Sequence, residues 1–201
     1  MTRIIAGAAR GRRLAVPRGR GTATRPTSDR AREGLFATVT TIRGPLHGAT
    51  VLDLFAGSGA VGLEALSRGA ARVVFVESDP RAARVIRANM AAAALPGGEL
   101  VCDRVERFLR RRPGAGTPVD LAGTPADLVV ADPPYAASGD EVTAMLDALA
   151  GGGWLAPGAL VAVERATRSG AVRWPEGYIP DRSRQYGEAT FWYGLAAAEV
   201  S

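Results

Sequence analysis

The chain has almost none of the residues from which metal and disulfide sites are built. Its 201 residues include one cysteine, Cys102, one histidine, His47, and no lysine. A single cysteine cannot form a disulfide within the chain, and these two residues do not make a zinc cluster, so we expect no metal. The sequence also lacks an apolar run long enough to span a membrane, and its N-terminus is too basic for a signal peptide. We therefore expect a cytoplasmic protein without membrane contact.

Positive charge is present, but it is concentrated at one end. Residues 1–43 hold ten arginines against two acids, a net charge of +8, whereas the other residues hold 15 arginines against 18 acids. A merely solvated segment in an arginine-rich protein would not explain this concentration, which is typical of a surface that binds a polyanion. We predict that nucleic acid is bound by eight of these arginines: Arg3, Arg10, Arg12, Arg13, Arg18, Arg20, Arg25 and Arg30.

From residue 50 onward, short apolar segments alternate with helical ones. Strands are predicted at 51–55, 72–77, 99–103, 127–132 and 159–164, and helices at 60–68, 80–94, 104–111 and 140–150. Nearly continuous apolar strands between helices indicate an α/β fold, with a parallel sheet covered on both faces.

The two ends of the chain add further elements to this pattern. A hairpin is predicted within 3–17, a helix starting at Ser28 or Asp29, and an antiparallel hairpin at 183–195. The segment 112–126 is rich in proline and glycine and is predicted to be a loop. We divide the chain into a basic extension, residues 1–27, and an α/β domain, residues 28–201.

A glycine-rich loop follows the first strand of the α/β pattern. The stretch VLDLFAGSGAVGLEAL places Gly57, Gly59 and Gly62 between a strand and a helix, which is the setting in which G-x-G-x-x-G binds a nucleotide-like ligand. Glu77 ends the second strand 18 residues after Gly59, where a carboxylate can accept both hydroxyls of a ribose. The spacing predicts an adenosine-type cofactor.

Two further acids separate the candidate cofactors. Asp53 lies inside the first strand, where a carboxylate would repel a pyrophosphate but attract the ammonium and sulfonium of S-adenosylmethionine. Asp103 closes the third strand, where an acid can accept from an adenine amino group. Each acid alone is equally well a solvated strand end, but the three beside this loop favour S-adenosylmethionine over NAD and a nicotinamide oxidoreductase. The predicted cofactor residues are Asp53, Phe55, Gly57, Ser58, Gly59, Glu77, Ser78, Asp103 and Arg104.

The fourth strand ends in Asp132-Pro133-Pro134-Tyr135, a sequence that suits methyl transfer to an aromatic amine. Such an amine is a weak nucleophile because its lone pair is delocalised into the ring. A carboxylate and a proline-directed carbonyl, on Asp132 and Pro133, can each hold one N–H and aim the lone pair at a methyl group. Pro134 stiffens the turn, and Tyr135 can stack on an extruded base. These four residues are the predicted catalytic residues.

The motifs together resemble one family, the bacterial 16S ribosomal RNA guanine-N2 methyltransferases. RIIAGAARGRRLAVP, TRPTSDRAREGLF, VLDLFAGSGAVGLEALSRGA, FVE, DPPY and YGEATFWY occur in the family's order over nearly the whole chain. The resemblance implies a Rossmann-like class I methyltransferase with a mostly parallel seven-stranded sheet, helices on both faces and an N-terminal β-hairpin.

The same resemblance implies a function and further site residues. S-adenosylmethionine would be the donor and a guanine of 16S RNA the target, either in free RNA or within the small ribosomal subunit, and the protein would be a monomer. A loop of Thr24, Arg25, Pro26 and Thr27 would lie near cofactor and base, with Thr27 and Asp132 contacting the cofactor. Two alternatives stay open, an N6-adenine or other amino methyltransferase and a non-enzymatic RNA-binding assembly factor. Within the stretch RRRPGAGTPVDLAGTP, the 112–126 loop is longer than the family leads us to expect.

Overall fold

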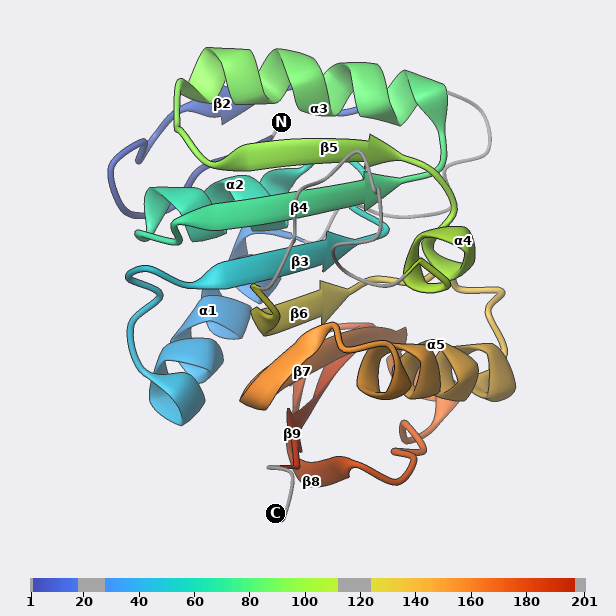
Figure 1. The fold of residues 1–201 in the computed structure, drawn as a ribbon. Helices are drawn as coiled ribbons and strands as arrows, with labels where there is room; N and C mark the ends of the chain where they lie inside the picture. The colour runs from blue at the N-terminus through green and yellow to red at the C-terminus, as the bar shows by residue number, and fades with distance from the viewer. Residues whose placement is uncertain (1, 18–27, 112–123, 198–201) are drawn as a thin grey trace.

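The computed structural model describes residues 2–17, 28–111 and 124–197, and within them the dominant element is a seven-stranded sheet (Figure 1). Its strand order is β5-β4-β3-β6-β7-β9-β8; β3 to β7 run parallel, and β9 is antiparallel to both of its neighbours. The strands are β3 (Thr50–Leu54), β4 (Arg72–Glu77), β5 (Gly98–Cys102), β6 (Ala126–Ala131), β7 (Leu155–Ala166), β8 (Tyr178–Tyr186) and β9 (Ala189–Ala196). The mostly parallel seven-stranded sheet predicted above is confirmed.

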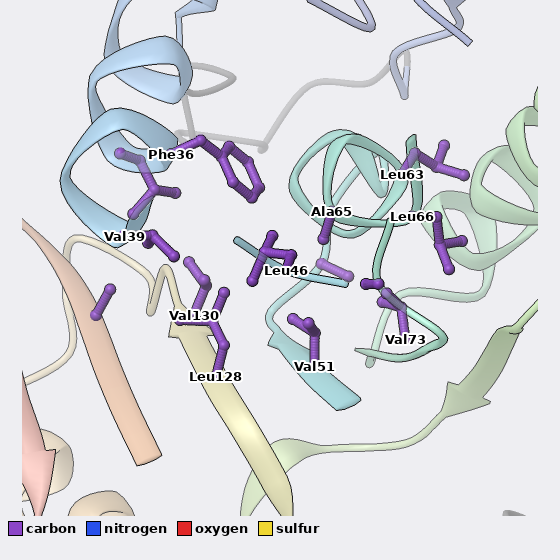
Figure 2. Packing of buried hydrophobic residues seen from close by; sticks show 14 of the residues in the cluster. Phe36, Val39, Leu46, Val51, Leu63, Ala65, Leu66, Val73, Leu128 and Val130 are labelled. Atoms are coloured by element: carbon purple, nitrogen blue, oxygen red, sulfur yellow. The ribbon is translucent and has the colours of Figure 1, made fainter. Parts of the chain in front are cut away.

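Helices cover both faces of the sheet because strand side chains alternate between two apolar cores. The first core packs one face against α1 (Asp29–Arg43), α2 (Ala60–Ser67) and α3 (Pro80–Ala93). Figure 2 shows part of it, where Phe36 and Val39 of α1 and Leu63 of α2 point toward Val51 and Val130 of the sheet. The second core packs the other face against α4 (Val105–Leu109) and α5 (Gly139–Gly151).

The strand order reverses beside β3, and this reversal positions the site. β3 pairs with β4 on one side and with β6 on the other, while the helices that follow β3 and β6 cover opposite faces. The chain therefore separates at the carboxyl ends of β3 and β6, and ligands of open α/β sheets bind at such a point.

The N-terminal strands β1 (Thr2–Arg3) and β2 (Arg13–Leu14) form the predicted antiparallel pair. It lies beside α2 and α3 in Figure 1. Ile4 and Leu14 are buried in the first core, so apolar packing joins this pair to the α/β body.

Most predicted elements agree with the structure, and three boundaries were wrong. Ala126, assigned to the 112–126 loop, begins β6, because its N–H bonds to the carbonyl of Trp154 at 2.8 Å. Strand β7 begins at Leu155 rather than 159, since a register shift carries the Pro157–Gly158 turn sequence within the strand. The terminal hairpin begins at Tyr178, five residues before position 183. Residues 112–123 lie outside the described part of the chain.

Candidate active site

The glycine loop begins with a residue in an unfavourable backbone conformation. Phe55, directly after β3, has φ 61°, and Gly57 and Gly59 follow with φ 57° and 75°. A left-handed phenylalanine costs about 1–3 kcal/mol, and such residues gather at ligand sites. These three residues turn the chain sharply from β3 into α2, which places the loop at the carboxyl edge of the sheet.

Glu77, at the end of β4, binds the glycine loop directly. Its carboxylate accepts the N–H of Gly57 and the N–H of Asp79, each at 2.8 Å. These two bonds fix the position of the carboxylate, which is half-buried at the edge of the sheet. Glu77 therefore shapes the loop, and it lies where the sequence predicts a ribose contact.

Asp53 is buried on β3 and accepts a single printed hydrogen bond, from the N–H of Gly62 at 2.9 Å. Burial raises the pKa of Asp53 to about 8, the Gly62 N–H opposes this rise, and the charge of Glu77 adds to it. A cationic group nearby would offset the cost of ionising this carboxyl. The site therefore fits a cofactor with an ammonium group, as the sequence predicts.

Asp103, the predicted adenine acceptor, is paired with arginines. It follows β5, with one carboxylate oxygen 2.6 Å from Arg111 and the other 3.4 Å from Arg107. The N–H of Arg104 also donates to it at 2.8 Å. An adenine at this position would share the carboxylate with Arg111. Ser78 and the Arg104 side chain are exposed at the same edge.

The Asp-Pro-Pro-Tyr sequence lies directly beside the glycine loop. The N–H of Asp132 donates to the carbonyl of Leu54 at 3.3 Å, which extends the β3–β6 ladder by one residue. The chain then leaves the sheet at Pro133, and a turn closes with the N–H of Ala137 bonded to the carbonyl of Pro134 at 2.8 Å. Tyr135 is 39% exposed, an unusual position for so large an apolar side chain.

Four acids share one face of the sheet at this edge. By strand alternation, Asp53, Glu77, Asp132 and Glu164 all point to the face that α1–α3 cover. Glu164 is buried on β7, one step beyond the last β6–β7 pair and so level with Asp132. Burial raises the pKa of Asp132 well above its usual value, and the charges of Glu164 and Asp53 raise it further.

The sequence analysis did not identify Glu164 as a site residue. The available signal was its position, because Glu164 ends the predicted strand 159–164 as Asp132 ends 127–132. Adjacent parallel strands bring such ends together.

The predicted RNA-binding arginines divide into two groups. Arg3, Arg10, Arg12, Arg13 and Arg30 are exposed at the N-terminal end of the described chain, where a polyanion can reach them. The predicted residues Arg18, Arg20, Arg25 and Thr27, with the rest of the 24–27 loop, lie outside the described residues.

Within the described ranges, no group of three histidines, cysteines or acids lies close enough to hold a metal ion. No helix of those ranges combines the length and apolar character needed to cross a membrane.

Comparison with known proteins identifies the family. The family described as "Conserved hypothetical protein 95" matches residues 2–194. The Escherichia coli K12 protein "Ribosomal RNA small subunit methyltransferase D" is 35% identical over 189 residues, which cover 94% of this chain and 87% of that protein. The Haemophilus influenzae protein of the same name is 35% identical over 167 residues, covering 81% and 77%.

Solved structures agree with this result. The structure of Escherichia coli yhhF is 31% identical, has a TM-score of 0.81 and covers 98% of both chains. An RNA methyltransferase from Salinibacter ruber, solved with S-adenosyl-L-homocysteine, is 17% identical with a TM-score of 0.62, covering 88% of this chain and 97% of that one, and supports the class I fold. The chain therefore belongs to the family of ribosomal RNA small subunit methyltransferases, which are enzymes of the S-adenosylmethionine-dependent class.

Proposed function

We propose that the protein transfers a methyl group from S-adenosylmethionine to the exocyclic N2 of a guanine in 16S ribosomal RNA. The observation that carries this proposal is the contact between Asp132 and Leu54, which joins the Asp-Pro-Pro-Tyr turn to the strand before the glycine loop. A methyl donor at the loop and an amine at the turn would thus lie side by side.

The residues around the loop would hold the cofactor. When bound, S-adenosylmethionine supplies a methyl group on a positively charged sulfur. Glu77 would accept the ribose hydroxyls, Asp53 would face the ammonium, and Asp103 would accept from the adenine amine. The other predicted contacts, from Phe55, Gly57, Ser58, Gly59, Ser78, Arg104 and Thr27, are part of this proposal.

Asp132 and Pro133 would prepare the target nitrogen. The Asp132 carboxylate and the Pro133 carbonyl would each accept one N–H, which pulls the nitrogen away from planarity and frees its lone pair. The nitrogen must lose one proton when it gains a carbon. Asp132 is a suitable acceptor because burial and the neighbouring acids raise its pKa.

Tyr135 would hold the extruded base beside Asp132. Stacking of a base on an aromatic ring contributes roughly 1–3 kcal/mol, and the exposed part of the Tyr135 ring is available for it. Pro134 would limit the movement of the ring relative to the carboxylate.

The N-terminal residues 1–27 would contribute the RNA-binding surface, and residues 28–201 the methyltransferase domain. The eight predicted arginines would contact RNA phosphates, whether the substrate is free RNA or an assembled small subunit. We place the protein in the cytoplasm as a monomer, in keeping with this substrate.

A nucleoside analysis tests the activity. Small-subunit RNA and whole subunits from cells that lack the enzyme are incubated with the protein and methyl-labelled S-adenosylmethionine, digested and analysed by mass spectrometry. We expect label in N2-methylguanosine. Label in N6-methyladenosine would show an adenine enzyme, and no label on either substrate would favour an RNA-binding assembly factor.

A salt titration tests the RNA surface. We expect the triple substitution Arg10→Ala, Arg12→Ala and Arg13→Ala to weaken RNA binding and to flatten its dependence on salt by about 0.7–0.9 per lost phosphate contact. Cofactor affinity should not change. Arg182→Ala with Arg184→Ala is the control, because these exposed residues lie on β8 at the opposite edge of the sheet. An unchanged salt slope in the triple variant would remove the hairpin from the interface.

A further inference from the structure

Asn89 is a polar side chain on the buried stripe of α3, and it is 2% exposed. The other residues of that stripe are apolar: Ala82, Ala83, Ile86 and Ala93. A buried amide destabilises the fold unless its donors and acceptor are bonded, so the contacts of Asn89 show what the residue is for.

Asn89 joins two segments that are distant in the sequence. Its Oδ1 accepts the N–H of Ala15 at 2.8 Å, and its Nδ2 donates to the carbonyl of Ala15 at 2.9 Å. The second Nδ2 hydrogen is directed to the carbonyl of Ser58 at 2.9 Å. One side chain thus binds both the residue that follows β2 and the glycine loop.

The Ser58 bond holds the glycine loop on a second side. Glu77 binds the N–H of Gly57, and Asn89 binds the carbonyl of the next residue. Gly57 and Gly59 have no side chains with which to hold a conformation of their own. The shape of the loop therefore depends on these two contacts.

The Ala15 bonds hold the arginine-bearing hairpin. Ala15 directly follows Arg13, and Arg10, Arg12 and Arg13 are exposed on the same short segment. A movement of this segment on binding a polyanion would be transmitted to Asn89, because the Ala15 peptide shares both of its hydrogen-bonding groups with that side chain.

We propose that Asn89 is a positioning residue that couples RNA binding on the N-terminal hairpin to cofactor binding at the glycine loop. This inference rests on the proposed function. RNA that orders the hairpin fixes Ala15, and through Asn89 it fixes Ser58, so the cofactor binds a loop that is already in place. Coupling between binding sites is reciprocal, so the cofactor also favours RNA binding.

The first experiment measures the affinity of S-adenosylhomocysteine by calorimetry, with and without saturating unmethylated small-subunit RNA. In the unsubstituted protein we expect the RNA to raise this affinity by about fivefold or more. In Asn89→Ala we expect the factor to fall to within about twofold of one. A merely structural loss would weaken both affinities and leave their ratio unchanged.

Ser67→Ala is the matched control. The Ser67 hydroxyl accepts the N–H of Ala9 at 2.9 Å and donates to the carbonyl of Ala6 at 2.5 Å, so it anchors the same hairpin to α2. The structure gives it no hydrogen bond to the glycine loop. Ser67→Ala should loosen the hairpin and keep the coupling factor of the unsubstituted protein.

Hydrogen exchange on the unsubstituted protein supplies a second test, which holds even where Asn89→Ala does not fold. S-adenosylhomocysteine alone should slow exchange of the Ala15 amide, since that amide donates to Asn89. An unchanged Ala15 rate would overturn the coupling. If neither RNA nor S-adenosylhomocysteine binds, the proposed function itself fails. If both bind and Asn89→Ala keeps the full coupling factor, only the coupling is wrong.

Discussion

Replacing Asp53 by asparagine tests how the site binds a cationic ligand. Burial raises the pKa of Asp53 to about 8, so at neutral pH the free protein holds this carboxyl mainly in its protonated form. An ammonium group close to Asp53 favours the ionised form, and binding must then release a proton. We expect the affinity for S-adenosylhomocysteine to rise with pH and to level off near pH 8.

The size of this effect follows from the linkage between proton and ligand. Displacing one proton changes the affinity by up to tenfold per pH unit below the pKa, so binding at pH 8 is up to about 100-fold tighter than at pH 6. Asp53→Asn has no proton to release, and its side-chain oxygen still accepts the N–H of Gly62. The variant should bind weakly with a flat profile over the same range.

Calorimetry in two buffers with different ionisation enthalpies counts the proton directly. At pH 7 the unsubstituted protein should release close to one proton per ligand beyond that of Asp53→Asn, and this difference cancels the titration of the ligand's own amine. Equal affinities at pH 6 and pH 8, without buffer dependence, would refute the placement of the ammonium beside Asp53.

The same raised pKa predicts a stability effect of definite sign. The unfolded chain ionises Asp53 near its ordinary value of 3.8, whereas the folded protein holds the proton until about pH 8. Asp53 therefore lowers the free energy of unfolding progressively from about pH 4 to pH 8 and by a constant amount above that. The stability of Asp53→Asn relative to the unsubstituted protein should increase over the same range.

Three further substitutions test other parts of the site. Asp132→Ala should lower kcat by about 10²–10³-fold in the methylation assay while S-adenosylhomocysteine affinity is nearly unchanged, and substantial residual turnover would contradict its role. Glu164→Gln removes a negative charge that raises the pKa of Asp132, so the acid limb of the kcat/KM profile should move to lower pH; an unmoved limb would separate the two acids. Gly62→Ala should destabilise the protein by about 1–3 kcal/mol in urea unfolding, because its Cβ would lie 2.2 Å from the Phe75 ring; an unchanged midpoint would show that Phe75 moves aside.

The sheet could be predicted from the sequence because burial on both faces leaves a simple pattern. A strand covered on two sides is apolar throughout, so β3, β4, β5 and β6 could be located within one residue of their observed ends. The turn residues at Pro157 and Gly158 hid the start of β7, since local turn chemistry is overridden there by pairing with β6.

The polar groups buried between helices could not be predicted in this way. Arg32 and Glu64 occur in helical segments where charged residues ordinarily face water, yet both are fully buried. Arg32 donates to Thr2 at 3.0 Å and to the carbonyl of Arg3, while Glu64 accepts from the chain that follows. Each charge is satisfied by a segment about 30 or 60 residues away, which no local pattern reveals.

These buried charges decide how the N-terminal segment should be tested. Glu64 accepts the N–H groups of Ile5 and Ala6 at 2.7 and 3.0 Å, and the Ile4 side chain is buried in the first core. Deleting residues 1–17 would remove both donors from a buried carboxylate and expose the apolar surface beneath Ile4.

The loss of one buried apolar side chain and two charged hydrogen bonds amounts to at least about 3 kcal/mol, a large fraction of the 5–15 kcal/mol that stabilises a typical domain. We expect the truncated protein to unfold at a clearly lower temperature and to lose cofactor binding together with RNA binding. A truncated protein with an unchanged Tm would show that the hairpin adds nothing to the fold. Loss of RNA binding by truncation therefore does not locate the RNA surface, whereas substitution of the exposed Arg10, Arg12 and Arg13 does, because their side chains lie outside the core.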